Sequence, residues 1–301
     1  MKPRLRRRVR LARVVLLSLA GFALILMMLE RRLVYPAPVA DETIASFVPP
    51  DAEDVSFESA DGVRLHGWFF PHEKLEMTVA NGAAPRAVLY CHGNGETVPR
   101  NLARMRLLRD VLGASIFVFD YRGYGKSEGK PYERGVIADG AAARRWLAER
   151  TGVASAEVVL YGRSLGTAVA CALAADETAD GEPAAGGAKA LVLESAFTRL
   201  TDAAAHHYRF LPVRLLMRNR FDSLARIAKH DGPVFAMHGT DDWVVPIEQG
   251  RLLFEAAPGG PKRFVEIPHA GHNDTPPREC FEEMRQFLDT ATSAATGPDG
   301  L

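Results

Sequence analysis

A serine flanked by glycines is the pattern in this chain that points most directly to covalent chemistry. Residues 162–166 read GRSLG, so Ser164 stands between Gly162 and Gly166 where an apolar run ends. A G-x-S-x-G sequence is typical of a sharp strand-to-helix turn that exposes the serine hydroxyl. The helix that follows would direct its N–H groups and the positive end of its dipole at a developing oxyanion. The pattern therefore predicts a nucleophile.

A serine hydroxyl is a weak nucleophile at its ordinary pKa, so it needs a general base and a carboxylate that orients the base. Candidates follow Ser164 in the chain order expected for this kind of turn, acid before histidine. The segment HGTDDWVVP carries Asp241 and Asp242, and the segment IPHAGHND carries His269 and His272. The residues alone leave open which member of each pair would act.

Strands and helices alternate along the chain. Apolar runs predict strands at 86–93, 115–120, 157–162, 190–195, 233–239 and 262–268. Alternation around the Asp61-Gly62 turn predicts a hairpin over 54–70. Helices are predicted at 99–112, 132–149, 165–175, 247–256 and 278–289, a loop at 72–86 and a surface insertion at 176–188. This alternation is typical of a mostly parallel sheet with helices on both faces. Ligands of such sheets bind beyond the carboxyl ends of the strands, which is where the candidate residues fall.

Several segments together resemble the α/β-hydrolase family of serine hydrolases. They are YCHGNGE, FDYRGYGKSEGKP, YGRSLGTAVA, HGTDDWVVP and AGHND, which occur in this order across about residues 55–290. The chain is most similar to a membrane-anchored group that includes serine aminopeptidase-like proteins and α/β-hydrolase-domain acyl hydrolases. The resemblance implies an α/β-hydrolase fold with a mostly parallel eight-stranded sheet.

The resemblance also implies roles for individual residues. Ser164 would be the nucleophile, His272 the general base, and Asp242 the carboxylate that orients the base. The backbone N–H groups of Leu165 and Asn94 would form the oxyanion hole, a role that needs only an amide proton.

The resemblance also favours one member of each candidate pair, the two aspartates and the two histidines. The family places its acid three residues after the glycine of this turn, which favours Asp242 over Asp241, and the GHND match favours His272 over His269. The resemblance implies no metal ion and no organic cofactor.

The predicted activity is the hydrolysis of small or lipid-like acyl esters or thioesters through an acyl-enzyme on Ser164. These leaving groups need less assistance than an amine. Cleavage of amides or peptides by the same triad, as in an aminopeptidase, is the alternative within the class. The motifs also fit an acyltransferase with the same triad, and the fold fits a non-catalytic binding protein.

Segment 196–230 follows the strand after the nucleophile helix, where a cap is often inserted in this fold. Its apolar residues could line an acyl-binding pocket: Phe197, Tyr208, Phe210, Leu211, Leu215 and Leu216. Ordinary packing of helices on the sheet explains the same residues, so both interpretations stay open.

The N-terminus has the pattern of a membrane segment. Seven basic residues lie within 1–13, and 14–29 carries no charge until Glu30. As a helix this stretch would span about 24 Å, somewhat less than the hydrocarbon layer, and flanking arginines can extend to the interface. It is slightly long for a signal peptide, and no A-x-A cleavage site follows. We therefore expect a retained anchor at 14–33, with a cleaved signal peptide and a secreted or periplasmic protein as the alternative.

The basic residues also predict the direction of the anchor. Seven precede the apolar segment and two directly follow it, which places the N-terminus in the cytoplasm and the rest of the chain outside. We expect a linker at 34–53, a catalytic domain at 54–290 and a disordered tail at 291–301.

Composition narrows the remaining possibilities. Of 301 residues, 37 are Lys or Arg and 37 are Asp or Glu, so the formal net charge is zero. This balance gives no support for a nucleic-acid partner. The three cysteines form no CxxC pair, which argues against a zinc site or a disulfide framework. The oligomeric state does not follow from the sequence.

Overall fold

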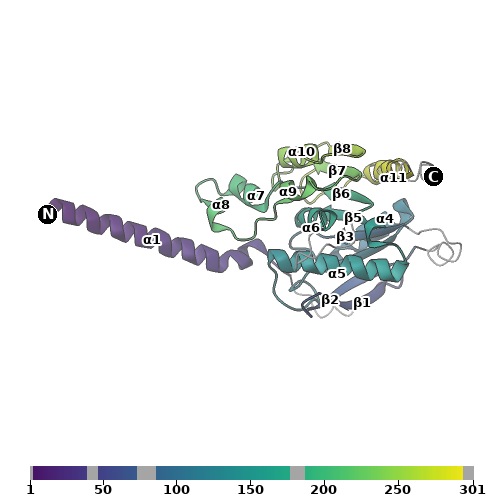
Figure 1. Cartoon of the computed structure of the whole chain (residues 1–301), viewed down its shortest axis with the longest axis horizontal. Coiled ribbons are helices and arrows are strands. Elements are labelled where there is room, and N and C mark those ends of the chain that lie inside the picture. The colour runs from purple at the N-terminus through teal and green to yellow at the C-terminus, as the bar shows by residue number, and fades with distance from the viewer. Residues whose placement is uncertain (1–2, 39–46, 73–85, 177–186, 294–301) are drawn as a thin grey trace.

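The computed structural model describes residues 3–38, 47–72, 86–176 and 187–293. It consists of an α/β body and a long helix, α1 (Pro3–Val34), which projects from one end of that body (Figure 1). Several predicted segments lie partly or largely outside the described residues: the basic segment 1–13, the linker 34–53, the surface segments 72–86 and 176–188, and the tail 291–301.

A single sheet of eight strands forms the centre of the body. The strands are β1 (Glu53–Glu58), β2 (Arg64–Phe70), β3 (Ala87–Cys91), β4 (Ser115–Asp120), β5 (Val159–Arg163), β6 (Ala190–Glu194), β7 (Val234–Gly239) and β8 (Lys262–Ile267). Their order is β1-β2-β4-β3-β5-β6-β7-β8, and only the β1–β2 and β2–β4 pairs are antiparallel. The mostly parallel eight-stranded sheet and the hairpin over 54–70 are confirmed.

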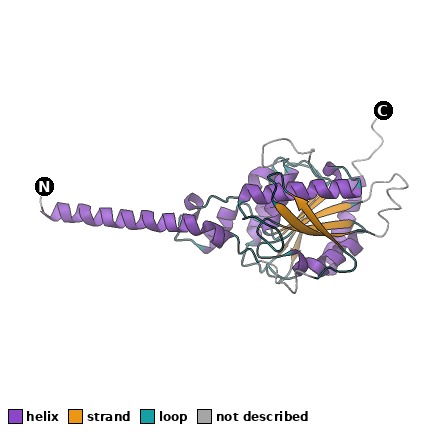
Figure 2. Ribbon diagram, turned by 90° about the horizontal axis from the view of Figure 1, so that it is seen from below, coloured by secondary structure: helices purple, strands orange, loops and turns teal. Residues whose placement is uncertain are grey.

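Helices cover both faces of the sheet (Figure 2). They are α4 (Leu102–Leu112), α5 (Glu133–Thr151), α6 (Leu165–Ala174), α7 (Leu200–His207), α8 (Val213–Leu216), α9 (Ser223–Ile227), α10 (Ile247–Glu255) and α11 (Arg278–Ser293), with short 3-10 turns η1 (Val98–Asn101) and η2 (Ser155–Glu157). One apolar core joins the sheet to α5, α6, α9 and α10, and a second joins its other face to α4 and α11.

The burial of the central strands explains why helices on both faces of the sheet could be predicted. Every residue of β3, β4 and β5 is buried, on both sides of each strand. Such continuous apolar runs suit a parallel sheet that has helices on both faces. Helix α4 buries one side through Met105 and Leu108 and ends at Gly113, whose positive φ of 57° closes the helix in a left-handed cap.

The predicted domain boundaries differ from the observed elements at both ends of the body. Helix α1 continues to Val34 and Tyr35 is buried, so the first residues of the predicted linker belong to the folded body. Helix α11 continues to Ser293, past the predicted domain end at 290.

Two segments beyond the sheet matter for the site. Helices α7, α8 and α9 fall within 196–230, between β6 and β7 in the chain, and α7 and α8 lie on the side of the body from which α1 projects (Figure 1). Within α1, Arg13–Val34 is long and apolar enough to cross a membrane, and almost none of it is buried. We call α7, α8 and the loop between them the cap.

Candidate active site

Ser164 lies in a strained turn between β5 and α6. Its backbone has φ 50° and ψ −116°, and α6 begins at the next residue. Few non-glycine residues adopt a positive φ, and such strain persists only where the surroundings fix it. Hydrogen bonds hold the turn on both sides, since Ser164 N donates to Glu194 O at 2.9 Å and Thr167 N donates to Ser164 O at 2.9 Å.

The two glycines around Ser164 allow backbone segments to approach closely. A Cβ at Gly166 would lie 1.9 Å from the carbonyl oxygen of Cys91, at the end of β3. A Cβ at Gly162 would lie 2.4 Å from the carbonyl oxygen of Gly166. Both separations are far below any van der Waals contact, so only glycine fits either position. The glycines therefore let α6 start directly over the ends of β3 and β5.

Three side chains from distant parts of the chain meet above this turn. His272 Nε2 lies 3.0 Å from Ser164 Oγ, and His272 Nδ1 lies 2.7 Å from Asp242 Oδ2. An ionised carboxylate only accepts, so Nδ1 carries the hydrogen and Nε2 is left to accept from the serine hydroxyl. The arrangement is chemically able to draw a proton from Ser164 Oγ to His272 and to stabilise the resulting imidazolium.

Asp242 is held by four donors in a buried position. Its Oδ1 accepts from the backbone N–H groups of Val244 at 3.0 Å and Val245 at 2.8 Å. Its Oδ2 accepts from His272 and also lies 3.2 Å from His238 Nε2, which in turn lies 2.8 Å from the Val245 carbonyl oxygen. Because both neighbours of His238 Nε2 are acceptors, that nitrogen carries a hydrogen.

These donors decide the charge of Asp242. Burial alone would raise its pKa, but the hydrogen bonds from His238 and His272 outweigh burial and hold the pKa far below its usual range. The carboxylate therefore stabilises the folded chain above the ordinary aspartate pKa of about 3.9, and this contribution is lost as the pH falls below that value. At neutral pH the carboxylate is charged and fixed in one orientation.

Arg163, the residue before the serine, fixes the loop that carries His272. Its side chain is buried and pairs with Glu96 on one side and with Glu194, at 3.2 Å, on the other. Its Nη2 donates to the carbonyl oxygen of His272 at 2.7 Å and to Asn273 Oδ1 at 3.2 Å. A buried guanidinium with this many partners positions the histidine backbone relative to the serine turn.

The rejected candidates lie elsewhere. Asp241 and His269 are both exposed, and they face each other across 3.6 Å outside the site. His269 has a positive φ of 60° and lies in the turn that follows β8. The structure thus brings Ser164, Asp242 and His272 together, while Asp241 and His269 are turn residues.

A pocket of about 650 Å³ opens beside Ser164 and His272, and its lining is mostly apolar. Four of the six apolar residues proposed from segment 196–230 line it, namely Phe197, Tyr208, Leu211 and Leu216. The other two do not, since Phe210 is fully exposed and Leu215 is 83% exposed. The cap therefore forms a pocket wall through one of its sides and presents the other side to the surroundings.

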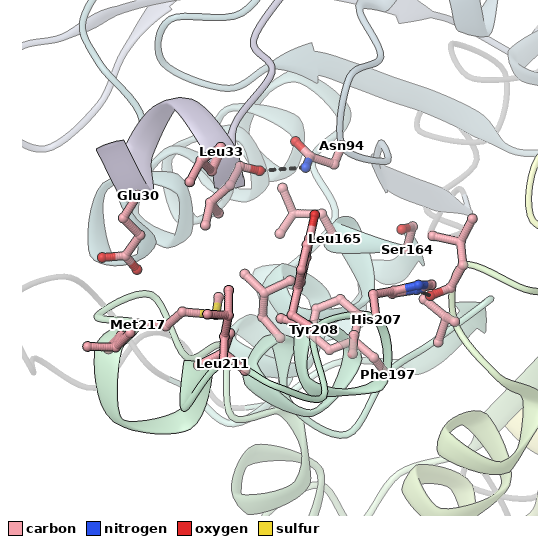
Figure 3. Close-up of a pocket in the computed structure, with 18 of the residues that line it drawn as sticks. Glu30, Leu33, Asn94, Ser164, Leu165, Phe197, His207, Tyr208, Leu211 and Met217 are labelled. Carbon is pink, nitrogen blue, oxygen red and sulfur yellow. Dashed lines mark hydrogen bonds between the residues drawn. The ribbon is translucent and has the colours of Figure 1, made fainter. Parts of the chain in front are cut away.

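The two residues proposed for the oxyanion hole line the same pocket. Leu165 begins α6 and Asn94 follows β3, and both lie beside Ser164 (Figure 3). The Asn94 side chain is held from two directions, because Tyr124 Oη donates to its Oδ1 and its Nδ2 donates to the carbonyl oxygen of Val34, each at 2.6 Å. This fixes the loop whose backbone N–H would face an oxyanion.

Sequence reasoning missed two positioning residues, His238 and Arg163. His238 precedes a glycine at a strand end and is interpreted more simply as a turn residue, yet it donates toward Asp242. Arg163 occupies the variable position of the G-x-S-x-G pattern, which carries no signal of its own. Among the described residues, no group of three His, Cys, Asp or Glu side chains is placed to hold a metal ion, and the expectation of no cofactor stays a prediction.

Comparisons with known proteins agree with this architecture. A model of the alpha/beta hydrolase fold matches residues 86–222. The protein Rv2307c of Mycobacterium tuberculosis is 39% identical over 91% of this chain and 92% of its own length. The alpha/beta hydrolase domain-containing protein WAV2 of Arabidopsis thaliana is 31% identical over 85% of each chain. The chain belongs to the α/β-hydrolase family.

Two further comparisons concern proteins whose names state an activity. A lysophosphatidylserine lipase, ABHD12 of Danio rerio, is 35% identical over 56% of this chain and 47% of its own length. The esterase Pf2001 of Pyrococcus furiosus superposes with a TM-score of 0.62 at 22% identity, covering 86% of this chain and 99% of that one. The chain is thus a hydrolase-fold protein with esterase and lipase neighbours.

The close approach at Gly166 has a consequence for stability. Gly166→Ala should lower the free energy of unfolding by at least about 2 kcal/mol, because the added Cβ would overlap the Cys91 carbonyl oxygen. Gly271→Ala is the matched control in the His272 loop, since its nearest neighbour, Asp274 Oδ2, would be 3.5 Å away. It should change stability by less than about 0.5 kcal/mol. Denaturant unfolding of the full-length protein measures both, and equal stability of the two variants would contradict the observed turn.

Proposed function

We propose that this chain is a membrane-anchored serine hydrolase that cleaves acyl esters or thioesters with Ser164, His272 and Asp242. One observation carries the proposal: an unbroken line of hydrogen bonds runs from Ser164 Oγ through His272 to a buried Asp242, at the wall of an apolar pocket. The similarity to a protein named a lysophosphatidylserine lipase supports an ester substrate.

The acylation step follows from the geometry. As Ser164 Oγ attacks the acyl carbon, its proton moves to His272 Nε2, 3.0 Å away. A new C–O bond forms and the carbonyl oxygen becomes an oxyanion, which the N–H groups of Leu165 and Asn94 would stabilise. The bond to the leaving oxygen or sulfur then breaks, and His272 gives its proton to that atom. The alcohol or thiol departs and leaves an acyl-Ser164 ester.

Deacylation repeats these steps with water. His272 Nε2, now neutral again, takes a proton from a water molecule as its oxygen attacks the acyl carbon. The second oxyanion collapses, the bond to Ser164 Oγ breaks, and His272 returns the proton to the serine. The products are a carboxylic acid and the free enzyme. Asp242 stays ionised throughout and stabilises the imidazolium each time it forms.

The pocket favours an acyl substrate over a peptide with a free amino terminus. Among the described residues that line it, Glu30 is the only carboxylate. Its Oε1 already accepts hydrogen bonds from Arg218 N, Asn219 N and Asn219 Nδ2 at 2.7–3.0 Å. The lining thus offers an ammonium group one carboxylate with an oxygen that already holds three hydrogen bonds, whereas it offers an acyl chain mostly apolar side chains.

We also propose that the catalytic body lies outside the cytoplasm, because basic residues are concentrated before the apolar part of α1. An alkaline phosphatase fused after residue 40 should be active in a bacterial host, since that enzyme needs an oxidising compartment for its disulfides. A fusion after residue 12, before the apolar segment, should be inactive and serves as the control. The reverse pattern would place the catalytic body in the cytoplasm.

Removal of the nucleophile tests the proposed chemistry directly. A fluorophosphonate probe should label the wild type and fail to label Ser164→Ala, because the probe reacts only with an activated serine. Ser155→Ala, in the short turn η2 before β5, is the control and should label fully. Hydrolysis of a panel of acyl esters of graded chain length should disappear with the labelling. Equal labelling of the wild type and Ser164→Ala would exclude Ser164 as the nucleophile.

The two neighbouring aspartates give a sharper test. Asp242→Asn should lower kcat on the order of 10⁴-fold, because an amide at this position favours the wrong tautomer of His272. Asp241→Asn removes the same charge from an exposed position next to it and should leave kcat nearly unchanged. Steady-state rates on one ester decide between them. If Asp241→Asn were the inactive variant, the triad would be wrongly assigned.

A further inference from the structure

Helix α1 reaches the candidate active site. It is continuous from Pro3 to Val34, and its last turns line the same pocket as Ser164 and His272. Leu26 and Leu33, both within the membrane-compatible span Arg13–Val34, form part of that lining. Figure 3 shows the end of α1 above the cap with Asn94 beside it. The pocket would therefore be incomplete without the segment that resembles an anchor.

Polar contacts fix this end of α1 to both sides of the pocket. Glu30 is buried, and its Oε1 accepts three hydrogen bonds from Arg218 and Asn219, which follow the cap. The Val34 carbonyl oxygen accepts from Asn94 Nδ2 at 2.6 Å (Figure 3). A carboxylate this buried is stable only with such donors, so these hydrogen bonds fix the position of the helix on the body. The contact between Val34 and Asn94 links α1 to the loop that carries one proposed N–H group of the oxyanion hole.

If α1 is inserted in a membrane, its apolar stretch determines how far the pocket lies from the hydrocarbon layer. The uncharged residues end at Leu29, and Glu30 is followed by the exposed Arg31 and Arg32. At 1.5 Å per residue, Leu26 and Leu33 are about 10 Å apart along the helix. The lining thus begins within the apolar stretch and ends beside the arginines, which suit the headgroup layer.

The outer side of the cap has the character of a membrane-facing surface. Phe210 is fully exposed and Leu215 is 83% exposed. Leu215 belongs to α8, which contacts α1. Arg209 and Arg214, also exposed, stand beside these two apolar residues in the chain. Exposed large apolar residues next to basic ones are typical of segments that rest in the interface of an anionic membrane.

We propose that α1 is a wall of the substrate pocket as well as an anchor, and that the substrate is a single-chain acyl ester taken from the same bilayer. The acyl chain enters between α1 and the cap, lies against Leu26, Leu33 and Leu211, and brings its carbonyl carbon to Ser164. A volume of about 650 Å³ suits one chain and its linkage, since pockets for one small ligand occupy roughly 300–1,000 Å³. The chemical step rests on the proposed function, but the binding of the chain does not.

The test uses full-length protein in phosphatidylcholine vesicles and two measurements, each made on a pocket variant and a matched control variant. The first is the ratio of the hydrolysis rate of a palmitoyl monoester in the bilayer to that of a soluble acetyl ester. Leu26→Trp, which fills the pocket, should lower this ratio at least about tenfold. Ile25→Trp, on an exposed side of the same helix outside the lining, is the matched control and should leave the ratio unchanged.

The second measurement needs no catalysis. In Ser164→Ala protein, a monoacyl lipid with a diazirine in its chain should crosslink to the peptide that contains Leu26 and Leu33. Adding Leu26→Trp should remove most of this crosslinking, and adding Ile25→Trp should not. Lipid in the same vesicles as the protein should crosslink faster than lipid supplied in separate vesicles.

The outcomes separate the two proposals. If Leu26→Trp and Ile25→Trp behave alike in both measurements, α1 is not a pocket wall and the inference is overturned. Equal crosslinking from separate vesicles would overturn the bilayer route. If the wild type hydrolyses no ester but the Ser164→Ala protein crosslinks in the expected pattern, the proposed activity fails while the pocket for a single acyl chain is supported.

Discussion

The close approach of backbone at Gly162 and Gly166 is the constraint on which the site depends. A Cβ at Gly166 would stand 1.9 Å from the Cys91 carbonyl oxygen, so α6 can begin over the ends of β3 and β5 only because both positions lack a side chain. This contact holds Ser164 at its positive φ and lifts its hydroxyl above the sheet. Leu165 and Asn94 line the same pocket as Ser164 and His272.

The residue before the serine extends this constraint to the rest of the site. Because Ser164 points up from the turn, Arg163 points into the body, where it pairs with Glu96 and Glu194 and donates to the His272 carbonyl oxygen. Loss of one partner from a buried ionic group is costly, on the order of 3–5 kcal/mol, so the loops have little freedom to separate. One turn thus orients Ser164 on one side and the backbone of His272 on the other.

The sequence was informative where local pattern decides structure, and less so where loops meet. Apolar runs located six strands and the alternating segment 54–70 located the other two, and the family resemblance favoured Asp242 and His272 over their exposed neighbours. The contact of His238 with Asp242 could not be predicted, because it depends on how the turn after β7 folds back. Phe210 and Leu211 are equally apolar in sequence, yet only Leu211 lines the pocket. Likewise, an uncharged helix carries no mark that separates pocket-facing Leu26 from exposed Ile25.

Glu30 lies where the apolar stretch of α1 ends and where α1 contacts the body. A carboxylate at the end of an apolar stretch limits how deep the helix can lie in hydrocarbon, since an unpaired charge is costly there. The same carboxylate is buried against the backbone N–H groups of Arg218 and Asn219. The limit on the depth of the helix would therefore also limit the depth of the body. A flexible linker in its place would let the body turn freely above the membrane. With Glu30 and the Val34 contact to Asn94 in place, α1 keeps one orientation relative to the pocket, and under the proposed anchoring the pocket would keep one orientation toward the bilayer.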